Sequence, residues 1–137
     1  DANTLWLVER GADKIERLRG VVSDGRPRRA DLRASYVLPG IVGASSMAFH
    51  SGDSVPEFRD DLFVAAREGG YLLRVRFDRG DRTRAMTTEK LLEGRLGEVR
   101  AVVTAADGTL YVANGSTVWR LSSAVAKATV DSPARIQ

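Results

Sequence analysis

The sequence predicts an all-β chain that forms part of a β-propeller, and two observations carry this prediction. Short alternating apolar runs, separated by Gly, Asp, Asn and Pro, recur along all 137 residues, which is the pattern of strands. A hairpin-like unit also repeats three times, as repeat architectures require. The nearest candidate for a helix is the segment 83–92, and its three threonines weaken it.

Each repeated unit opens with a strand that starts with Leu and an aromatic residue. These first strands are 5–9 (LWLVE), 62–66 (LFVAA) and 110–114 (LYVAN). A short polar turn follows, and then a second strand with an Arg near its end: 14–18, 71–75 and 117–121. We expect the aromatic residues of these strands to pack between sheets: Trp6, Phe63, Tyr111 and Trp119.

The spacing of the units fits propeller blades. They start at Leu5, Leu62 and Leu110, so they lie 57 and 48 residues apart, near the roughly 40 to 50 residues of a four-stranded blade. The prediction is one partial propeller domain, 1–137, with blade segments near 1–20, 44–92 and 97–123, a loop insertion at 20–43 and a tail at 124–137. Since a ring takes roughly four to eight blades, this chain holds between two and three, and we expect the remaining blades N-terminal to it.

Composition excludes several classes of protein. The net charge is only +3, and the one dense basic run, Arg26 to Arg29, lacks stacking aromatics and a recognition helix, which argues against a nucleic-acid partner. The longest apolar run, 37–49, is broken by Pro and Gly, so we expect no membrane span. The absence of Cys excludes thiol chemistry and Cys-based metal sites.

Three motifs in order resemble a known family. They are a shortened Glu-His-Gly-like stretch at 9–16, a Ser-Ser strand with a Pro-Glu-aromatic turn at 44–59, and a Gly-x-x-Arg strand, Asp-Gly turn and Leu-Tyr-Val strand at 97–112. They are similar to the soluble quinoprotein glucose and sorbosone dehydrogenases. The resemblance implies the C-terminal part of a six-bladed propeller that oxidises sugars with pyrroloquinoline quinone (PQQ) and calcium.

The resemblance also implies cofactor-binding residues. The quinone carries three carboxylates, which Lys and Arg hold by charge-assisted hydrogen bonds. Arg100 matches one such position, and Arg67 is the available substitute at another. One step of strand register would point Arg67 to the opposite face, although a turn can relax that rule. Glu98 and Glu68 stand where the family has an Arg and a Lys. The alternative for Arg100 is an ordinary strand Arg that reaches a face of the disc.

For the metal and the substrate, the resemblance assigns a single turn. Gly11 and Ala12 would offer backbone carbonyls to calcium, and Asp13 would line the sugar pocket. Lys14 departs from the family, since a cation beside a calcium ligand set is unfavourable. The family's catalytic His belongs to an earlier blade. The implied partners are a sugar and an electron acceptor, and the implied location is periplasmic or secreted.

Other polar residues favour structural roles. His50, the only His, is expected to pack or to be exposed rather than to transfer protons. Asp53, Glu57, Asp60 and Asp61 lack the register of a calcium loop and are interpreted as solvated turn residues.

The resemblance therefore implies part of a PQQ-dependent sugar dehydrogenase that transfers a hydride from a sugar hydroxyl to the quinone. Two alternatives stay open. One is a degenerate propeller that binds a ligand or a protein, which the residues Glu98, Glu68 and Lys14 favour. The other is a calcium-dependent propeller hydrolase or lactonase.

Overall fold

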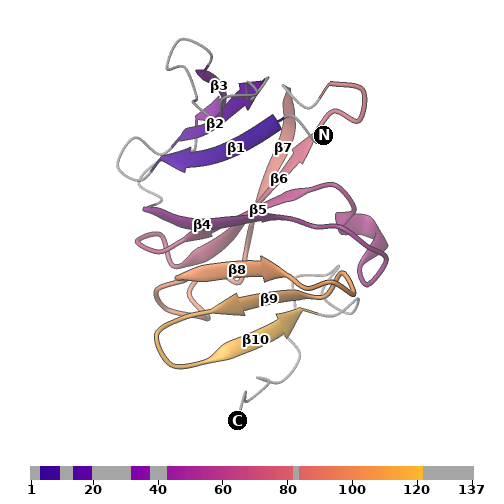
Figure 1. Ribbon diagram of the computed structural model, residues 1–137. Coiled ribbons are helices and arrows are strands. Elements are labelled where there is room, and N and C mark those ends of the chain that lie inside the picture. The colour runs from indigo at the N-terminus through magenta and orange to yellow at the C-terminus, as the bar shows by residue number, and fades with distance from the viewer. Residues whose placement is uncertain (1–3, 10–13, 20–31, 38–42, 82–83, 122–137) are drawn as a thin grey trace, which may run out of the picture.

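Three antiparallel sheets lie side by side in the computed structural model, which describes residues 4–9, 14–19, 32–37, 43–81 and 84–121 (Figure 1). The first sheet has the order β1 (Thr4–Glu9), β2 (Lys14–Arg19), β3 (Leu32–Val37). The second has the order β4 (Ala44–Phe49), β5 (Leu62–Ala66), β6 (Tyr71–Phe77), β7 (Ala85–Leu91). The third has the order β10 (Val118–Leu121), β9 (Leu110–Ala113), β8 (Ala101–Thr104).

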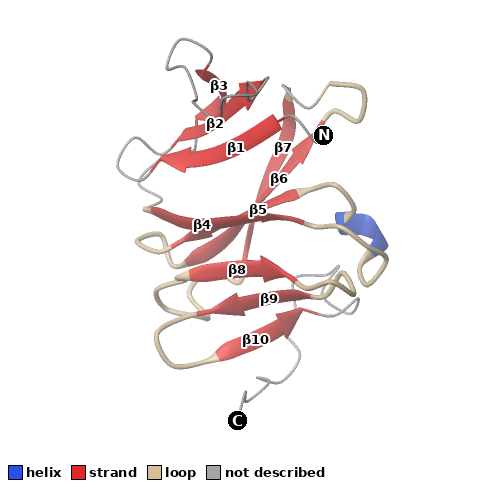
Figure 2. Cartoon of the chain, in the orientation of Figure 1, coloured by secondary structure: helices blue, strands red, loops and turns tan. Residues whose placement is uncertain are grey.

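Strands and their connections account for almost all described residues. One 3-10 turn, η2 (Pro56–Phe58), interrupts them between β4 and β5 (Figure 2). Each strand pairs with the strand before or after it in the chain, so every sheet is a meander. The predicted all-β class is confirmed, and sheets of this kind stacked face to face are propeller blades.

The three predicted hairpins are present and share one register. The aromatic residue in the second position of each first strand pairs with the Arg of the second strand. These pairs are Trp6 with Arg17, Phe63 with Arg74, and Tyr111 with Arg120. The sequence repeat is therefore a structural repeat, in which β1, β5 and β9 occupy equivalent places.

The structure differs from the prediction in two segments. β3 lies inside the predicted loop insertion 20–43 and pairs with β2. Its residues Leu32, Ala34 and Tyr36 alternate with other residues, which is the period of a strand. The segment considered as a helix contains β7 instead, whose β-branched Thr87 and Thr88 suit an exposed edge strand. Residues 20–31 and 38–42 of the insertion and the tail 124–137 lie outside the described residues.

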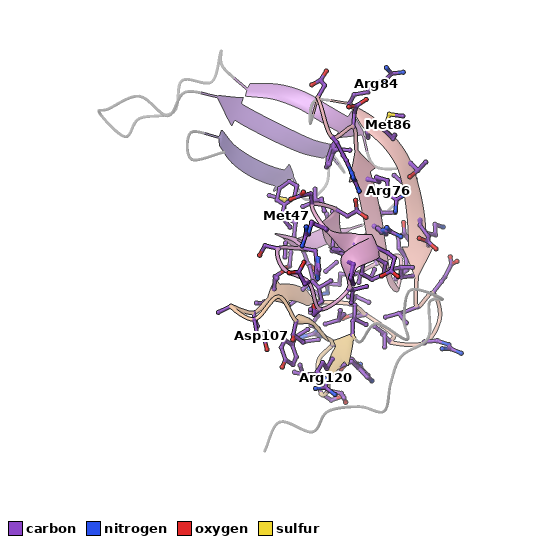
Figure 3. The ribbon with its side chains drawn as sticks, turned by 90° about the vertical axis from the view of Figure 1, so that its right-hand side faces the viewer. Met47, Arg76, Arg84, Met86, Asp107 and Arg120 are labelled. Carbon is purple, nitrogen blue, oxygen red and sulfur yellow. The ribbon has the colours of Figure 1, made fainter. Side chains whose placement is uncertain are left out.

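The second sheet carries a core on each of its faces. Alternate residues of β5 point to opposite faces, so Leu62 and Val64 join one buried cluster while Phe63 and Ala65 join the other. The cluster of Phe63 includes Val102, Leu110 and Val112 of the third sheet and is therefore the packing between two blades. The cluster of Leu62 lies on the side of the first sheet, where β1 contacts β4 (Figure 1). Met47 packs against this cluster and lies toward the first sheet in Figure 3.

Side-chain hydroxyls join the second and third sheets along β4 and β8. Ser46 Oγ lies 3.2 Å from both the carbonyl oxygen and the amide nitrogen of Val102. Thr104 Oγ1 donates to the Phe49 carbonyl at 2.8 Å. Ser45 Oγ donates to the Arg100 carbonyl at 2.9 Å. We call these contacts the β4–β8 seam.

Two glycines form a second contact between these sheets at the opposite end from Ser45. The predicted Asp107-Gly108 turn is confirmed, with Gly108 at φ +82° and its N–H donating to the Ala105 carbonyl at 2.9 Å. A Cβ on Gly108 would lie 2.7 Å from the Ser51 carbonyl oxygen and 2.9 Å from Gly52 Cα. Backbone therefore meets backbone here, and no side chain fits.

Replacement of Gly108 should reveal this contact. Gly94→Ala places Ala at φ +71° in open space and should lose about 1 kcal/mol of unfolding free energy from backbone strain. Gly108→Ala has the same strain and a clash with backbone, so it should lose about 2 kcal/mol or more. Denaturant unfolding of the full-length protein measures both losses. Equal losses would contradict the close approach of the two sheets.

Candidate functional site: an arginine cluster between two blades

Arg67 and Arg100 approach one another from two blades. Arg67 is the first residue after β5, in the turn 67–70, and Arg100 immediately precedes β8. This turn and the start of β8 lie at the same end of the sheets, on the left in Figure 1. Strand alternation stops at Ala66, so Arg67 lies in a turn, where the register rule for strand faces does not apply. The structure thus brings together the two residues predicted to bind the cofactor.

Glu98 bridges the two arginines. Its Oε2 atom accepts hydrogen bonds from Arg67 Nε at 3.2 Å and from Arg100 Nη2 at 3.1 Å. The hydrogen bonds from Arg100 and from Arg67 hold the pKa of Glu98 below its usual range. About half of the Glu98 and Arg100 side chains and a third of the Arg67 side chain are exposed. The cluster is therefore ionised, bears one net positive charge and is open to solvent.

The backbone around Arg100 is held more firmly than its side chain. Val99 is fully buried, the Arg100 N–H donates to the Ala113 carbonyl at 2.8 Å, and Ser45 Oγ donates to the Arg100 carbonyl. The guanidinium lies beside Gly115, where a Cβ would stand 3.5 Å from Cζ. Ser45 is a positioning residue that sequence reasoning did not single out, although it belongs to the Ser-Ser motif.

The chemistry of this donor set fits a carboxylate. Each guanidinium has five N–H donors, and Glu98 uses one from each. The Glu98 carboxylate already shows how a carboxylate sits between them. Glu68, also predicted at a cation position, is exposed and packs over Gly43, so it adds a second acidic group at this end of the second sheet.

The predicted calcium and substrate residues Gly11, Ala12 and Asp13 lie outside the described residues. Their flanking residues are described: Glu9 and Lys14 are register partners that close the hairpin of β1 and β2. This hairpin end lies on the same side as the turn 67–70 in Figure 1. Within the described ranges, no three acidic or His side chains gather as a metal site would need.

The opposite end of the second sheet holds a groove of about 610 Å3 around η2 and the end of β6. Asp61 lines it and is 4% exposed, so its interpretation as a solvated turn residue is wrong. Burial raises the pKa of Asp61, and the hydrogen bond from Arg74 acts in the opposite direction and lowers it. Arg74 Nε lies 2.7 Å from Asp61 Oδ2, and Arg74 Cζ lies 4.4 Å from the Phe58 ring centroid. A buried ion pair with these partners is a structural support.

His50 is buried beside this ion pair. Its ring meets Phe58 edge to face, and Nε2 lies 3.2 Å from Ser54 Oγ, which donates to the Gly108 carbonyl. Its Nδ1 atom is buried and has no hydrogen-bond partner in the part of the chain that the structure describes. These contacts agree with the packing role predicted for His50.

Comparison with known proteins identifies the family. The model of the glucose/sorbosone dehydrogenases matches residues 19–121, which is most of the chain. The chain belongs to this family. No curated protein matches the sequence.

Solved structures show the same fold. The soluble aldose sugar dehydrogenase of Escherichia coli is 21% identical with a TM-score of 0.59, over 80% of this chain and 37% of that one. A putative glucose dehydrogenase of Thermus thermophilus is 27% identical with a TM-score of 0.55, over 82% and 35%. The virginiamycin B lyase of Staphylococcus aureus is 13% identical with a TM-score of 0.58, over 97% and 38%.

The chain thus spans little more than a third of the length of these structures, as expected for a partial propeller. Among the described residues, no helix is long and apolar enough to cross a membrane.

Acid should destabilise the protein through His50. Burial lowers the pKa of His50 below its ordinary value of about 6.5, so the folded state holds the neutral ring. The stability that this contributes is complete above about pH 6.5 and is lost as the pH falls toward the folded pKa. His50→Gln should lose less stability than the wild type between pH 7.5 and 5. Denaturant unfolding at each pH gives the unfolding free energies of the wild type and the variant. Asp61, whose raised pKa acts in the opposite direction, is present in both proteins, so its contribution cancels in the difference between them. Parallel profiles would show that His50 does not titrate in this way.

Proposed function

We propose that the chain is the part of a sugar dehydrogenase that supplies two guanidinium groups to the carboxylates of PQQ. The observation that supports this most directly is the convergence of Arg67 and Arg100 on one carboxylate, from two blades and at one end of the sheets. Membership of the glucose/sorbosone dehydrogenase family supports the reaction class. When bound, the quinone would accept the hydride of the sugar hydroxyl.

The residues of this chain bind and orient rather than react. Arg100 stands on a backbone fixed by Ser45 and by the buried Val99, so its guanidinium can fix the position of a ligand carboxylate. Arg67 reaches the same point from a turn and can close over the ligand as a second donor. Two donors on separate blades orient a planar ligand better than one, because they restrain its rotation.

Calcium, the sugar and an electron acceptor belong to the same proposal. Gly11, Ala12 and Asp13 would contribute the carbonyls for the metal and one wall of the sugar pocket. These residues follow β1 in the chain. The end of the first sheet where β1 ends lies on the same side as the arginine cluster (Figure 1). Family membership also supports a periplasmic or secreted location.

The missing blades are the expected partners of the third sheet. Its outer face carries the row Val103, Tyr111 and Arg120, which is equivalent by register to the row Ala48, Phe63 and Arg74 of the second sheet. Phe63 is fully buried by the third sheet, whereas 56% of Val103 is exposed. An equivalent blade packed on this outer face would bury Val103 and Tyr111 in the same way.

A second candidate function is a ligand-binding or protein-binding propeller without the quinone. Glu98 favours it, because this carboxylate neutralises one of the two guanidinium charges. Glu68 adds a further negative charge at the same end of the sheet. The two candidates differ in whether PQQ binds.

Titration of PQQ with calcium into the full-length protein separates them. We expect binding that weakens about 10-fold or more in Arg100→Ala, which corresponds to about 1.4 kcal/mol. Arg84→Ala is the matched control, since Arg84 lies at the outer end of the second sheet, away from the third sheet (Figure 3). Calorimetry gives the affinities. If neither protein takes up PQQ, the binding module becomes the better description.

A further inference from the structure

Glu98 occupies the position between Arg67 and Arg100 that a bound carboxylate would take. A single oxygen, Oε2, accepts from both guanidinium groups, at 3.2 and 3.1 Å. This is the arrangement in which two arginines hold the carboxylate of a ligand. The chain therefore already contains one carboxylate bound in the cluster.

The Glu98 side chain is also able to leave. It is about half exposed, and its only hydrogen bonds among the described residues are those to the two arginines. Its backbone is held next to the buried Val99 and follows Gly97, so the side chain can turn into solvent without moving the strand. Exposed ion pairs of this kind are weak, because water and salt compete with them.

We propose that Glu98 is an internal competitor that occupies the arginine pair until a ligand with more than one carboxylate displaces it. The proposal rests on the proposed function, in which the cluster binds a polycarboxylate. A monocarboxylate would only exchange one carboxylate for another and would then stand beside the displaced, charged Glu98. A ligand with several carboxylates can place one carboxylate on each guanidinium group, whereas Glu98 offers a single oxygen to both. Glu98 thus lowers the affinity of the site for carboxylate ligands.

Glu98→Gln tests this inference in the full-length protein. Glutamine keeps the shape of the side chain and removes its charge, so the arginines become available. Calorimetric titration uses three probes: PQQ with calcium, citrate as a plain tricarboxylate, and acetate as a monocarboxylate. We expect citrate and PQQ to bind about 10-fold more tightly to Glu98→Gln than to the wild type. We also expect acetate to gain less than citrate, because the charge removed at Glu98 repels a trianion more strongly than a monoanion.

Two further variants control the experiment. Glu93→Gln removes an exposed glutamate of the preceding turn, paired with Lys90 at 3.3 Å, and should leave the affinities unchanged. Glu98→Gln combined with Arg100→Ala should abolish the gain, because the freed guanidinium is then absent. Circular dichroism and denaturant unfolding verify that each variant is folded.

Each outcome decides the matter. Weaker binding to Glu98→Gln would show that Glu98 holds the arginines in place for the ligand, which overturns the inference, and so would unchanged affinities for PQQ and citrate. Tighter citrate binding without any PQQ binding would support the inference on Glu98 and refute the proposed function. Tighter binding of both probes would support the two together.

Discussion

The β4–β8 seam determines the rest of the structure around the site. Among the described residues, no backbone ladder joins the second and third sheets, so side-chain contacts and the close approach of Gly52 and Gly108 set their relative position. Hydroxyl groups of Ser46 and Thr104 hydrogen bond to backbone groups of the facing strand, and the buried Phe63 and Val102 pack behind them. Arg67 belongs to the second sheet and Arg100 to the third. The distance between the two guanidinium groups is therefore set by the packing of two blades.

The same residue types serve different purposes at the two ends of the second sheet. Arg74 and Asp61 are almost fully buried, and the cation lies against the Phe58 ring. All three nitrogens of Arg74 donate to partners within the fold, namely Asp61, Glu89 and the Glu57 carbonyl. Loss of one partner of such a buried pair leaves an uncompensated charge. Arg67 and Arg100 are partly exposed and share one acceptor, which uses one N–H group of each. Burial, more than residue type, separates the structural arginine from the candidate binding residues.

Local patterns in the sequence predicted the hairpins, because a strand pair with a short turn needs only period-two alternation and turn residues. The pairing of each aromatic residue with an Arg follows from the same repeat. β3 was missed because Leu32 to Val37 is short and lies in a segment rich in Arg, Pro and Gly. The burial of Asp61 was missed because its partner Arg74 is 13 residues away and only the β5–β6 pairing brings them together.

The site was predicted in its residues but not in its geometry. Arg67 and Arg100 were found through resemblance to a family, while the direction of Arg67 depended on where β5 ends. In the sequence, Glu98 stood out only as a residue at a position where the family has an Arg. Its contact with Arg67 depends on the packing of two blades. The two residues are 31 positions apart in the chain, so no local pattern in the sequence predicts the contact.

The most direct test of this account is the NMR titration of the Glu98 side-chain carboxyl carbon in the full-length protein. The account predicts a pKa below the usual range for Glu, since Arg100 and Arg67 both donate to the ionised form. It also predicts a return toward that range when Arg67 and Arg100 are both replaced by Met. An ordinary pKa of Glu98 in the wild type, unchanged by the double replacement, would contradict the convergence of the two blades on this carboxylate.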